Sequence, residues 1–347
     1  MATIQLSDII DVTVFEDLQS ENDPKLTALY QSGVIASGEM FDALASAAGR
    51  SAELPFWRDL DHTSEPNYSS DQATSATPDK VQQDEMKTRK VHVNNGWSAM
   101  DLAVELQTGT NAMQHIRDRT AAYWTYYWQD RLVACALGIL NANVNGNFAT
   151  QSPGTAGDMV IDVAIEDGNN AAAANLFSRS AFVNAVFTMG DRGEDIRAIC
   201  VHSVVMKKMV DQDDIAYILD SAGTTRIPTY MGRTVIVDDS CPTVAGTTSG
   251  FKYVSILFGR AMFAYGEGSP NVPVEVWRDP QTGHGGGEEQ LWLRKTWLLH
   301  PFGHTNNNAV ATGNSGNQTL ADLRNQSNWT RVLARKNVPM AFLVTNG

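Results

Sequence analysis

The sequence predicts an α+β fold in which helices cover β-sheets. Residues 110–141 form one long segment with apolar side chains at helical spacing. Residues 171–265 alternate between helical and strand patterns, and residues 272–299 hold two alternating strands around a glycine-rich turn. A chain of 347 residues can bury a substantial core, so we expect one large domain or two of ordinary size.

The N-terminal part, residues 1–50, combines a short extended arm at residues 6–15 with helical fragments that are too weakly apolar to form a core alone. Such an arm either packs on its own domain or docks on a partner, and the sequence leaves both possibilities open. The first ten residues have neither a basic segment nor a continuous apolar core, so we expect no secretory signal.

Two strand patterns follow, at residues 54–60 and 87–93, with a long polar segment between them. This segment, residues 61–85, is rich in Ser, Thr, Asp, Gln and Pro and has hardly any apolar anchor. The pattern predicts a projecting hairpin. A loop of this length is unusual inside a compact domain, so it is either disordered or in contact with a partner.

The long helix is expected to begin near Thr110, after a short helix that a capping-box pattern at Ser98 and Asp101 predicts. One of its faces carries Met113, Ile116, Thr120, Tyr123 and Tyr127, and the face beside it carries Trp124, Trp128, Leu132 and Cys135. A helix that is apolar on two sides must bury both. Its charged residues exclude a membrane span, and we expect Gly138 and the asparagines after it to end it.

Residues 145–157, rich in Ala, Gly and Asn, predict a connector into a second region. There we expect helices at residues 171–189 and 204–210, the second capped by Ser203. Strands are expected at residues 198–202, 234–237 and 253–265. A short helix at residues 320–325 and a closing strand at residues 340–344 complete the pattern.

The formal net charge of −13 argues against nucleic-acid binding through a basic surface, because phosphate contacts need clustered Lys and Arg. Cys135, Cys200 and Cys241 lie far apart in the sequence. We interpret them as buried thiols of a reducing compartment and not as a disulfide or metal framework.

No motif predicts catalysis, a cofactor or a metal site. Residues 284–287 spell the His-Gly-Gly-Gly oxyanion loop of some esterases, but the Gly-x-Ser-x-Gly elbow that those enzymes need is missing, so a turn between strands is favoured. His300 and His304 have no Cys or carboxylate at ligand spacing. The aromatic cluster at residues 123–128 has no interleaved basic residues, which favours packing over a nucleic-acid platform.

The order of these elements resembles the major capsid proteins of tailed bacteriophages, which have the Hong Kong 97-type fold. The resemblance spans nearly the whole chain, and it lies in the joint order of several short segments. These are residues 54–57, 123–129, 202–203, 228–233, 235–239, 278–279, 293–294 and 300–303.

The resemblance implies a division into four parts. Residues 1–50 would form the N-terminal arm, residues 51–97 the extended loop, residues 98–156 and 270–347 the peripheral domain with its spine helix at about 110–141, and residues 157–269 the axial domain.

The resemblance also implies a function. The chain would assemble as pentamers and hexamers into the icosahedral shell that encloses a double-stranded DNA genome, without specific binding of the DNA and without a membrane. It would be made in the host cytoplasm and reside in the virion, with separate scaffolding, portal and decoration proteins as possible partners. We expect contacts between subunits at a set of residues in the arm and the extended loop: Phe15, Leu18, Asn67, Tyr68, Lys80, Lys87 and Lys90.

Some members of this fold family crosslink subunits through a Lys and an Asn, but nothing in the sequence marks a lysine here as reactive, so we predict no covalent chemistry. Two alternatives remain. One is the shell of a nanocompartment similar to an encapsulin, which uses the same fold. The other is an esterase-type hydrolase built on residues 284–287, which the missing nucleophile elbow disfavours.

Overall fold

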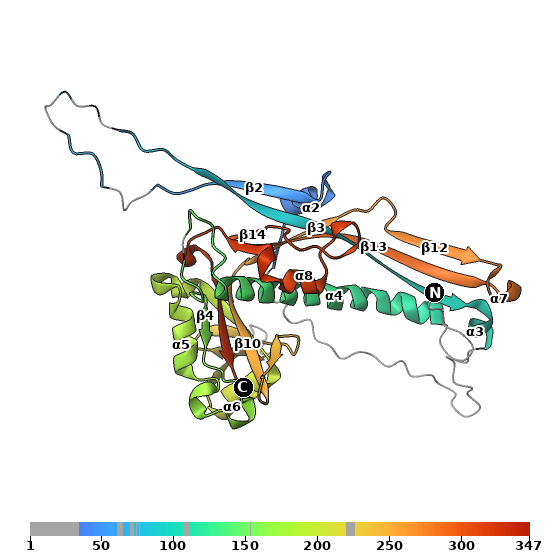
Figure 1. Cartoon of the computed structure of the whole chain (residues 1–347). Helices are drawn as coiled ribbons and strands as arrows, with labels where there is room; N and C mark the ends of the chain where they lie inside the picture. The colour runs from blue at the N-terminus through green and yellow to red at the C-terminus, as the bar shows by residue number, and fades with distance from the viewer. Residues whose placement is uncertain are drawn as a thin grey trace.

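The computed structural model describes residues 35–60, 65–69, 73, 75, 77–106, 112–152, 154–219 and 226–347. Its central element is helix α4, Ala112–Val144. One elongated sheet runs along this helix, and a second sheet packs against the C-terminal half of the helix from another side (Figure 1). The predicted α+β class is therefore confirmed.

The elongated sheet has the strand order β1-β11-β13-β3-β2, and β12 also pairs with β13. Its strands are β1 Ile35–Ser37, β2 Ser51–Trp57, β3 Gln83–Met100, β11 Phe263–Gly268, β12 Val274–Asp279 and β13 Glu288–Pro301. Strand β13 lies antiparallel to β3 along most of its length, from the Glu288–Met100 pair to the Leu299–Arg89 pair. The predicted return of a strand pair to the long helix is confirmed, because Trp297 of β13 packs against Trp124 of α4.

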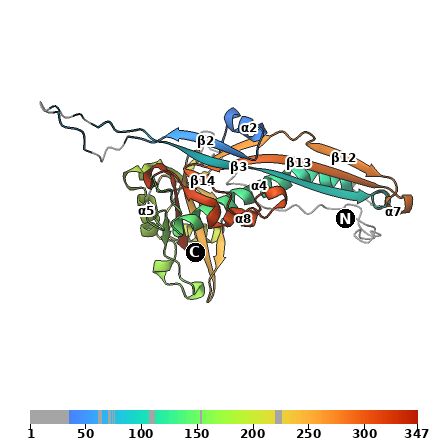
Figure 2. The same cartoon turned by 45° about the horizontal axis from the view of Figure 1, so that its top comes forward.

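The predicted hairpin is also confirmed. Strands β2 and β3 pair antiparallel up to Trp57 and Gln83, and beyond that pair the described residues of the two limbs extend away from the sheets (Figure 2). Strand β3 is longer than the pattern predicted because its second half pairs with β13. Helix α3, Asp101–Leu106, consequently begins two residues later than predicted, since Ser98, the predicted cap, is still part of the β3–β13 ladder.

Helix α4 continues through Gly138 and ends among the asparagines that follow it, so the predicted helix end is confirmed for the asparagines and wrong for the glycine. A Cβ at Gly138 would lie 2.0 Å from the carbonyl oxygen of Leu323 and 2.4 Å from Nε1 of Trp329. The glycine lets helix α8, Leu320–Arg324, and the strand after it approach the backbone of α4. The helix ends instead at Val144, before Asn145 and the positive φ of Gly146.

The second sheet has the order β4-β16-β10-β5-β8-β7-β6, with β9 paired to β10. Its strands are β4 Val160–Asp162, β5 Ile196–Val201, β6 Ile215–Leu219, β7 Arg226–Tyr230, β8 Arg233–Val237, β9 Thr243–Ala245, β10 Phe251–Gly259 and β16 Met340–Thr345. The closing strand β16 is buried along its whole length. The remaining short elements are β14 His304–Asn306, β15 Trp329–Arg331 and α7 Thr282–Gly285.

The predicted single strand over residues 253–265 is wrong. The chain forms β10 in the second sheet and β11 in the elongated sheet, and a turn with Ala261 at a φ of 56° redirects it between them. The predicted division assigned β11 to the axial domain, residues 157–269, but β11 lies in the elongated sheet. It assigned β16 to the peripheral domain, residues 270–347, but β16 lies in the second sheet. Periodicity alone cannot distinguish one long apolar strand from two strands in different sheets.

Two helices of the second region begin where side chains cap them. Helix α5, Arg179–Phe187, is capped by Ser178, whose hydroxyl accepts a hydrogen bond from the backbone N–H of Ala181, and it is shorter than predicted. Helix α6, Ser203–Asp211, is capped by Nδ1 of His202, which lies 3.2 Å from the backbone nitrogen of Val204. Ser203 is therefore the first helical residue and not the predicted cap.

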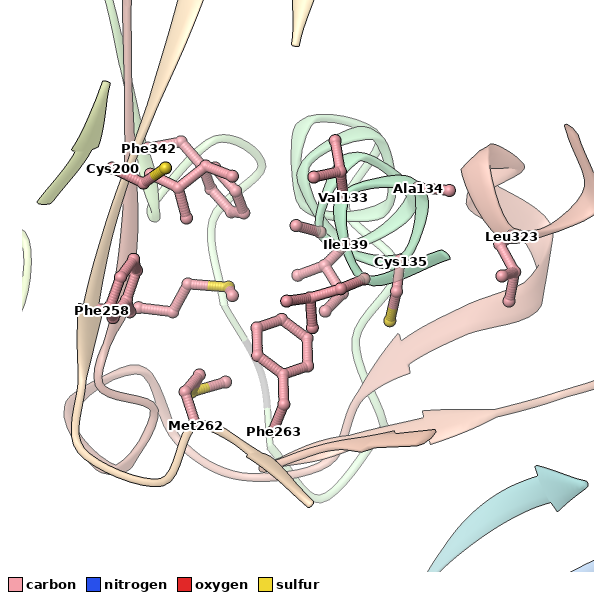
Figure 3. Close-up of a cluster of buried hydrophobic side chains, with 14 of the residues drawn as sticks. Val133, Ala134, Cys135, Ile139, Cys200, Phe258, Met262, Phe263, Leu323 and Phe342 are labelled. Carbon is pink, nitrogen blue, oxygen red and sulfur yellow. The ribbon is translucent and has the colours of Figure 1, made fainter. Parts of the chain in front are cut away.

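A single core joins both sheets across α4 (Figure 3). Phe258 of β10 and Phe342 of β16 lie on one side of the helix, and Leu323 of α8 lies on another. Ile139 and Cys135 of the helix are completely buried between them. The predicted burial of the helix on more than one side is confirmed.

The close approach at Gly138 generates a prediction. Ala in place of Gly inside a helix ordinarily stabilises it by about 1 kcal/mol, but here the added methyl group meets backbone. We expect Gly138→Ala to lower the free energy of unfolding by about 3 kcal/mol, as overpacking does. Thermal and urea unfolding of the unassembled chain, followed by circular dichroism, measures this change.

The matched control is Gly38→Ala, since a Cβ at Gly38 meets nothing within 4 Å. We expect it to change stability by less than about 1 kcal/mol, the scale of a cap substitution. A Gly138→Ala chain as stable as the unaltered chain would contradict this account of the helix.

Candidate functional site

Exposed apolar side chains mark the projecting hairpin. Trp57 is 67 % exposed and Tyr68 is 80 % exposed, and Leu60 and Val81 are also exposed. These residues lie at the end of β2 and in the polar segment beyond it, outside the core clusters. Large exposed apolar side chains in a segment whose described residues join no core cluster indicate a surface for another molecule. We call this segment, residues 57–82, the hairpin tip.

A second exposed apolar surface lies on β12, at the opposite end of the elongated sheet (Figure 1). Val274 and Val276 are 54 % and 55 % exposed, and they stand opposite Leu293 and Leu291 of β13. Leu291 packs in a cluster with the first turn of α4. The apolar face of the sheet therefore continues beyond the part that α4 covers. We call Val274 and Val276 the β12 valine face.

Four of the predicted contact residues lie on exposed surface. Asn67, Tyr68 and Lys80 are in the hairpin tip, where Nδ2 of Asn67 donates a hydrogen bond to the carbonyl oxygen of Thr77 at 3.2 Å and so links its two limbs. Lys87 is exposed on β3 and forms an ion pair with Glu85 at 2.7 Å. The hydrogen bond from Lys87 to Glu85 raises the pKa of the lysine. Their contact with a neighbour stays a prediction.

Lys90 differs from the other predicted contact residues, because only 3 % of it is exposed. It stands opposite Leu298, on the face of the sheet that helix α2, Glu39–Ser46, covers. Its Nζ donates a hydrogen bond to the carbonyl oxygen of Ala47, and burial lowers the pKa of the lysine. The Lys90 side chain therefore makes its contacts within its own subunit. Phe15 and Leu18, which complete the predicted set, lie outside the described residues.

The aromatic cluster of α4 forms packing contacts. The rings of Trp124 and Trp297 meet edge to face at 5.6 Å between centroids, and those of Trp128 and Tyr265 do so at 5.0 Å. Such pairs add about 0.5–1.5 kcal/mol each beyond the area they bury. The expected packing role is confirmed for Trp124 and Trp128, which are both buried, while Tyr123 at 39 % exposure lies at the margin.

Sequence reasoning missed an ion pair between Arg331 of β15, which is buried, and Asp158 in the segment before β4, which is partly buried. Arg331 binds Asp158 with two hydrogen bonds, of 2.7 and 2.8 Å, and its guanidinium stacks on Phe148 at 4.4 Å. Burial alone would raise the pKa of Asp158, but the hydrogen bonds from Arg331 and Asn143 outweigh it and lower that pKa. No local signal identifies this pair, because its members are 173 residues apart.

The histidine candidates do not converge on a reactive centre. His284 lies in the turn between β12 and β13 at a φ of 56°, so the expected turn is confirmed. His300 and His304 are buried, and neither ring nitrogen of His300 has a hydrogen-bond partner among the described residues. Within the described part of the chain, no group of three or more His, Cys, Asp or Glu side chains is arranged to hold a metal ion.

Comparison with known proteins identifies the family of this chain. Residues 40–266 match the Gp13-like family, described as major capsid protein 13-like. The chain is also 34 % identical to the major capsid protein of Bacillus phage SPP1 over 342 residues, which cover 97 % of each protein. The chain belongs to the Gp13-like family of major capsid proteins.

Solved capsid structures show that this member of the Gp13-like family has the Hong Kong 97-type fold. The capsid protein of Ralstonia phage GP4 matches with a TM-score of 0.55 and 10 % identity, over 99 % of this chain and 98 % of that one. The capsid protein of cyanophage Pam1 also matches with a TM-score of 0.55, at 7 % identity and over the same shares of the two chains. The predicted fold is confirmed although sequence identity is very low.

Membership of the Gp13-like family assigns the chain its role as a structural protein of a phage capsid shell, located in the virion. The shell consists of many subunits, so the prediction of self-association is confirmed at that level. This assignment favours the capsid interpretation over the nanocompartment and hydrolase alternatives. None of the described helices combines the length and the apolar character that crossing a membrane requires.

The buried histidines predict how this capsid protein responds to acid. Burial lowers the pKa of His300 from 6.5 to about 4 and that of His304 to about 3. The folded chain therefore holds both rings neutral, whereas the unfolded chain protonates them below pH 6.5. The contribution of the neutral rings to the free energy of unfolding is fully present above pH 6.5. It is lost as the pH falls from 6.5 toward 4, and the loss for His300 is about 3 kcal/mol.

We expect His300→Leu to reduce this loss, because leucine fills the site without a titrating group. Unfolding of the unassembled chain by urea between pH 4 and 7 measures it. His284→Asn is the control, since His284 is exposed and Asn tolerates the same backbone conformation. Equal pH dependence in the two variants would refute the role of His300.

Proposed function

We propose that the chain assembles as hexamers and pentamers into an icosahedral shell around double-stranded DNA. The observation that carries the proposal is the pair of exposed apolar surfaces at opposite ends of the molecule, the hairpin tip and the β12 valine face. Two different surfaces at opposite ends suit a head-to-tail contact between copies. Such head-to-tail contacts form a closed ring when a whole number of the rotations that relate neighbouring copies makes a full turn.

In this proposal the hairpin tip lies on the neighbouring subunit. Burying a large apolar side chain such as Trp57 or Tyr68 stabilises a contact by roughly 1.5–3 kcal/mol at full burial. The ordering of the segment opposes part of this gain, so each contact is weak alone and strong when repeated around a shell. Asn67, Tyr68, Lys80 and Lys87 are the proposed contacts in the extended loop.

The proposed division of labour retains the four parts that the resemblance implied. Residues 1–50 serve as the arm, with Phe15 and Leu18 as proposed contacts, and residues 51–97 as the extended loop. Residues 98–156 and 270–347 make up the peripheral domain and residues 157–269 the axial domain, with β11 and β16 exchanged between them. The exchange of strands supports a rigid connection between the two domains.

The remaining partners follow from charge and role. A net charge of −13 keeps packaged DNA from adhering to the shell wall, so we propose that the DNA lies inside without specific binding. We further propose assembly in the host cytoplasm, with separate scaffolding, portal and decoration proteins. The role is structural, and no catalysed reaction or cofactor is part of this proposal.

Electron microscopy of the purified protein tests the proposal directly. We expect uniform closed shells tens of nanometres across, with six-fold and five-fold clusters resolved after averaging. A chain that stays monomeric under assembly conditions, even when a scaffolding protein is supplied, would overturn it.

The proposal predicts that deletion of residues 67–79 weakens shell assembly but leaves the subunit folded. The described residues of this segment are exposed and carry no core contacts, so the shortened chain should keep its circular dichroism spectrum and its unfolding midpoint. Shell yield, measured by sedimentation and electron microscopy, should fall at least tenfold. Replacement by a Gly/Ser linker of equal length distinguishes loss of side-chain contacts from loss of reach. Unfolding of the deleted chain would instead assign the segment to the core.

The proposal also predicts that polar substitutions on the β12 valine face weaken shell assembly. Val274→Ser combined with Val276→Ser should leave the stability of the subunit within about 1 kcal/mol, because both side chains are mostly exposed. Shell yield should fall severalfold if a neighbour covers this face. The matched control is Val244→Ser, which changes a valine of similar exposure on β9 in the other sheet. Equal shell yields from both variants would exclude the β12 valine face as a contact.

A further inference from the structure

The fold brings two of the cysteines together. Cys200 lies near the end of β5, and Cys241 lies in the turn after β8, 41 residues later. Their Sγ atoms are 2.8 Å apart, inside the van der Waals contact distance of two sulfur atoms. Both side chains are buried, at 0 % and 3 % exposure.

The backbone around this pair is held from several sides. Strands β5 and β8 pair in parallel, with Cys200 beside Ile236, and the backbone N–H of Cys241 donates to the carbonyl oxygen of Asp238 at 3.0 Å. Nε2 of Gln129 on α4 donates to Oδ2 of Asp238 at 2.8 Å and to Oγ of Ser240 at 3.0 Å. The turn is thus fastened to the central helix. The two sulfur atoms meet because the surrounding fold places them there.

The third cysteine offers an internal comparison. Cys135 is also completely buried, in the same core, but it projects from α4 and does not lie beside Cys200 (Figure 3). Burial raises the pKa of the Cys135 thiol. The hydrogen bond with Cys241, together with burial, raises the pKa of Cys200 as well. Both thiols therefore stay protonated and slow to react in a reducing cytoplasm.

We propose that Cys200 and Cys241 form an intrasubunit disulfide in the mature virion, once the particle has left the reducing interior of the host cell. The oxidant is a peroxide, which is small enough to enter the core during local opening. Hydrogen peroxide oxidises one thiol to a sulfenic acid and releases water. The second thiol attacks the sulfenic sulfur, the S–S bond forms, and a second water leaves. Two thiols thereby lose two electrons and one peroxide is reduced to two waters.

The bond would close a loop that spans β5, α6 and strands β6 to β8. Cross-linking two points this far apart restricts the unfolded chain and so stabilises the folded one. A buried disulfide is also shielded from thiol reductants. The shell would then be assembled with reversible contacts and made more resistant after release, which places the covalent step after assembly.

The test uses the full chain, both unassembled and as shells. Each sample is kept reduced or treated with hydrogen peroxide, unfolded in denaturant with a maleimide, and weighed by intact mass spectrometry. The reduced chain should carry three maleimide groups, one on each free cysteine. The oxidised chain should carry one, on Cys135, with the loss of two hydrogen atoms and a peptide that joins Cys200 to Cys241. The melting temperature of the oxidised subunit should rise by several degrees and return after reduction in denaturant and refolding.

Variants sharpen the assignment. Cys135→Ala should keep the peroxide effect, whereas Cys200→Ala and Cys241→Ala should each abolish it. Three reactive thiols after peroxide treatment, sulfinic acid at Cys200, or a bond that includes Cys135 would each overturn the proposal. The thiol count of the unaltered chain decides the outcome even where a variant does not fold. Because unassembled subunits are tested separately, failure of the disulfide is distinguishable from failure of shell assembly.

Discussion

The simultaneous burial of α4 by two sheets is the interaction on which the rest of the structure depends. Its middle packs Trp124 and Trp128 against Trp297 and Tyr265 of the elongated sheet. Its C-terminal half packs against the second sheet, within the same core cluster. Without the helix each sheet would present an apolar face to water, so neither sheet is complete by itself.

Buried polar contacts give this shared core a defined geometry. The Arg331–Asp158 pair joins the strand after α8 to the connector that leads into the second region, and Gln129 joins α4 to the turn after β8. Because Arg331 is buried, removing its partner Asp158 would leave an uncompensated buried charge, which costs about 3–5 kcal/mol. These contacts therefore fasten α4 to the turn after β8, and β15 to the segment that leads into β4. A subunit with a fixed shape can repeat the same contact many times in a shell.

Sequence patterns predicted the elements whose cause is local. The helical spacing of residues 110–141 and the polar segment between β2 and β3 both predicted correct elements, because periodicity and turn composition act within a few residues. The errors occurred where distant residues decide the outcome. Gly138 was expected to help end the helix, together with the asparagines after it, because a local pattern cannot show that Leu323 approaches its backbone. Lys90 was expected on a contact surface, yet α2 covers that face of the sheet.

The sequence by itself determined the α+β class, the long helix apolar on two sides, the hairpin and, through resemblance, the capsid fold. Each of these follows from the order and spacing of residue types along the chain, which are present before folding. Only the tertiary structure decided that β11 and β16 lie in opposite sheets and that Cys200 meets Cys241. It also decided that Val274 and Val276 are exposed, although α4 covers Leu291 on the neighbouring strand β13. These features depend on contacts between residues far apart in the chain, whose positions are set only when the packed core forms.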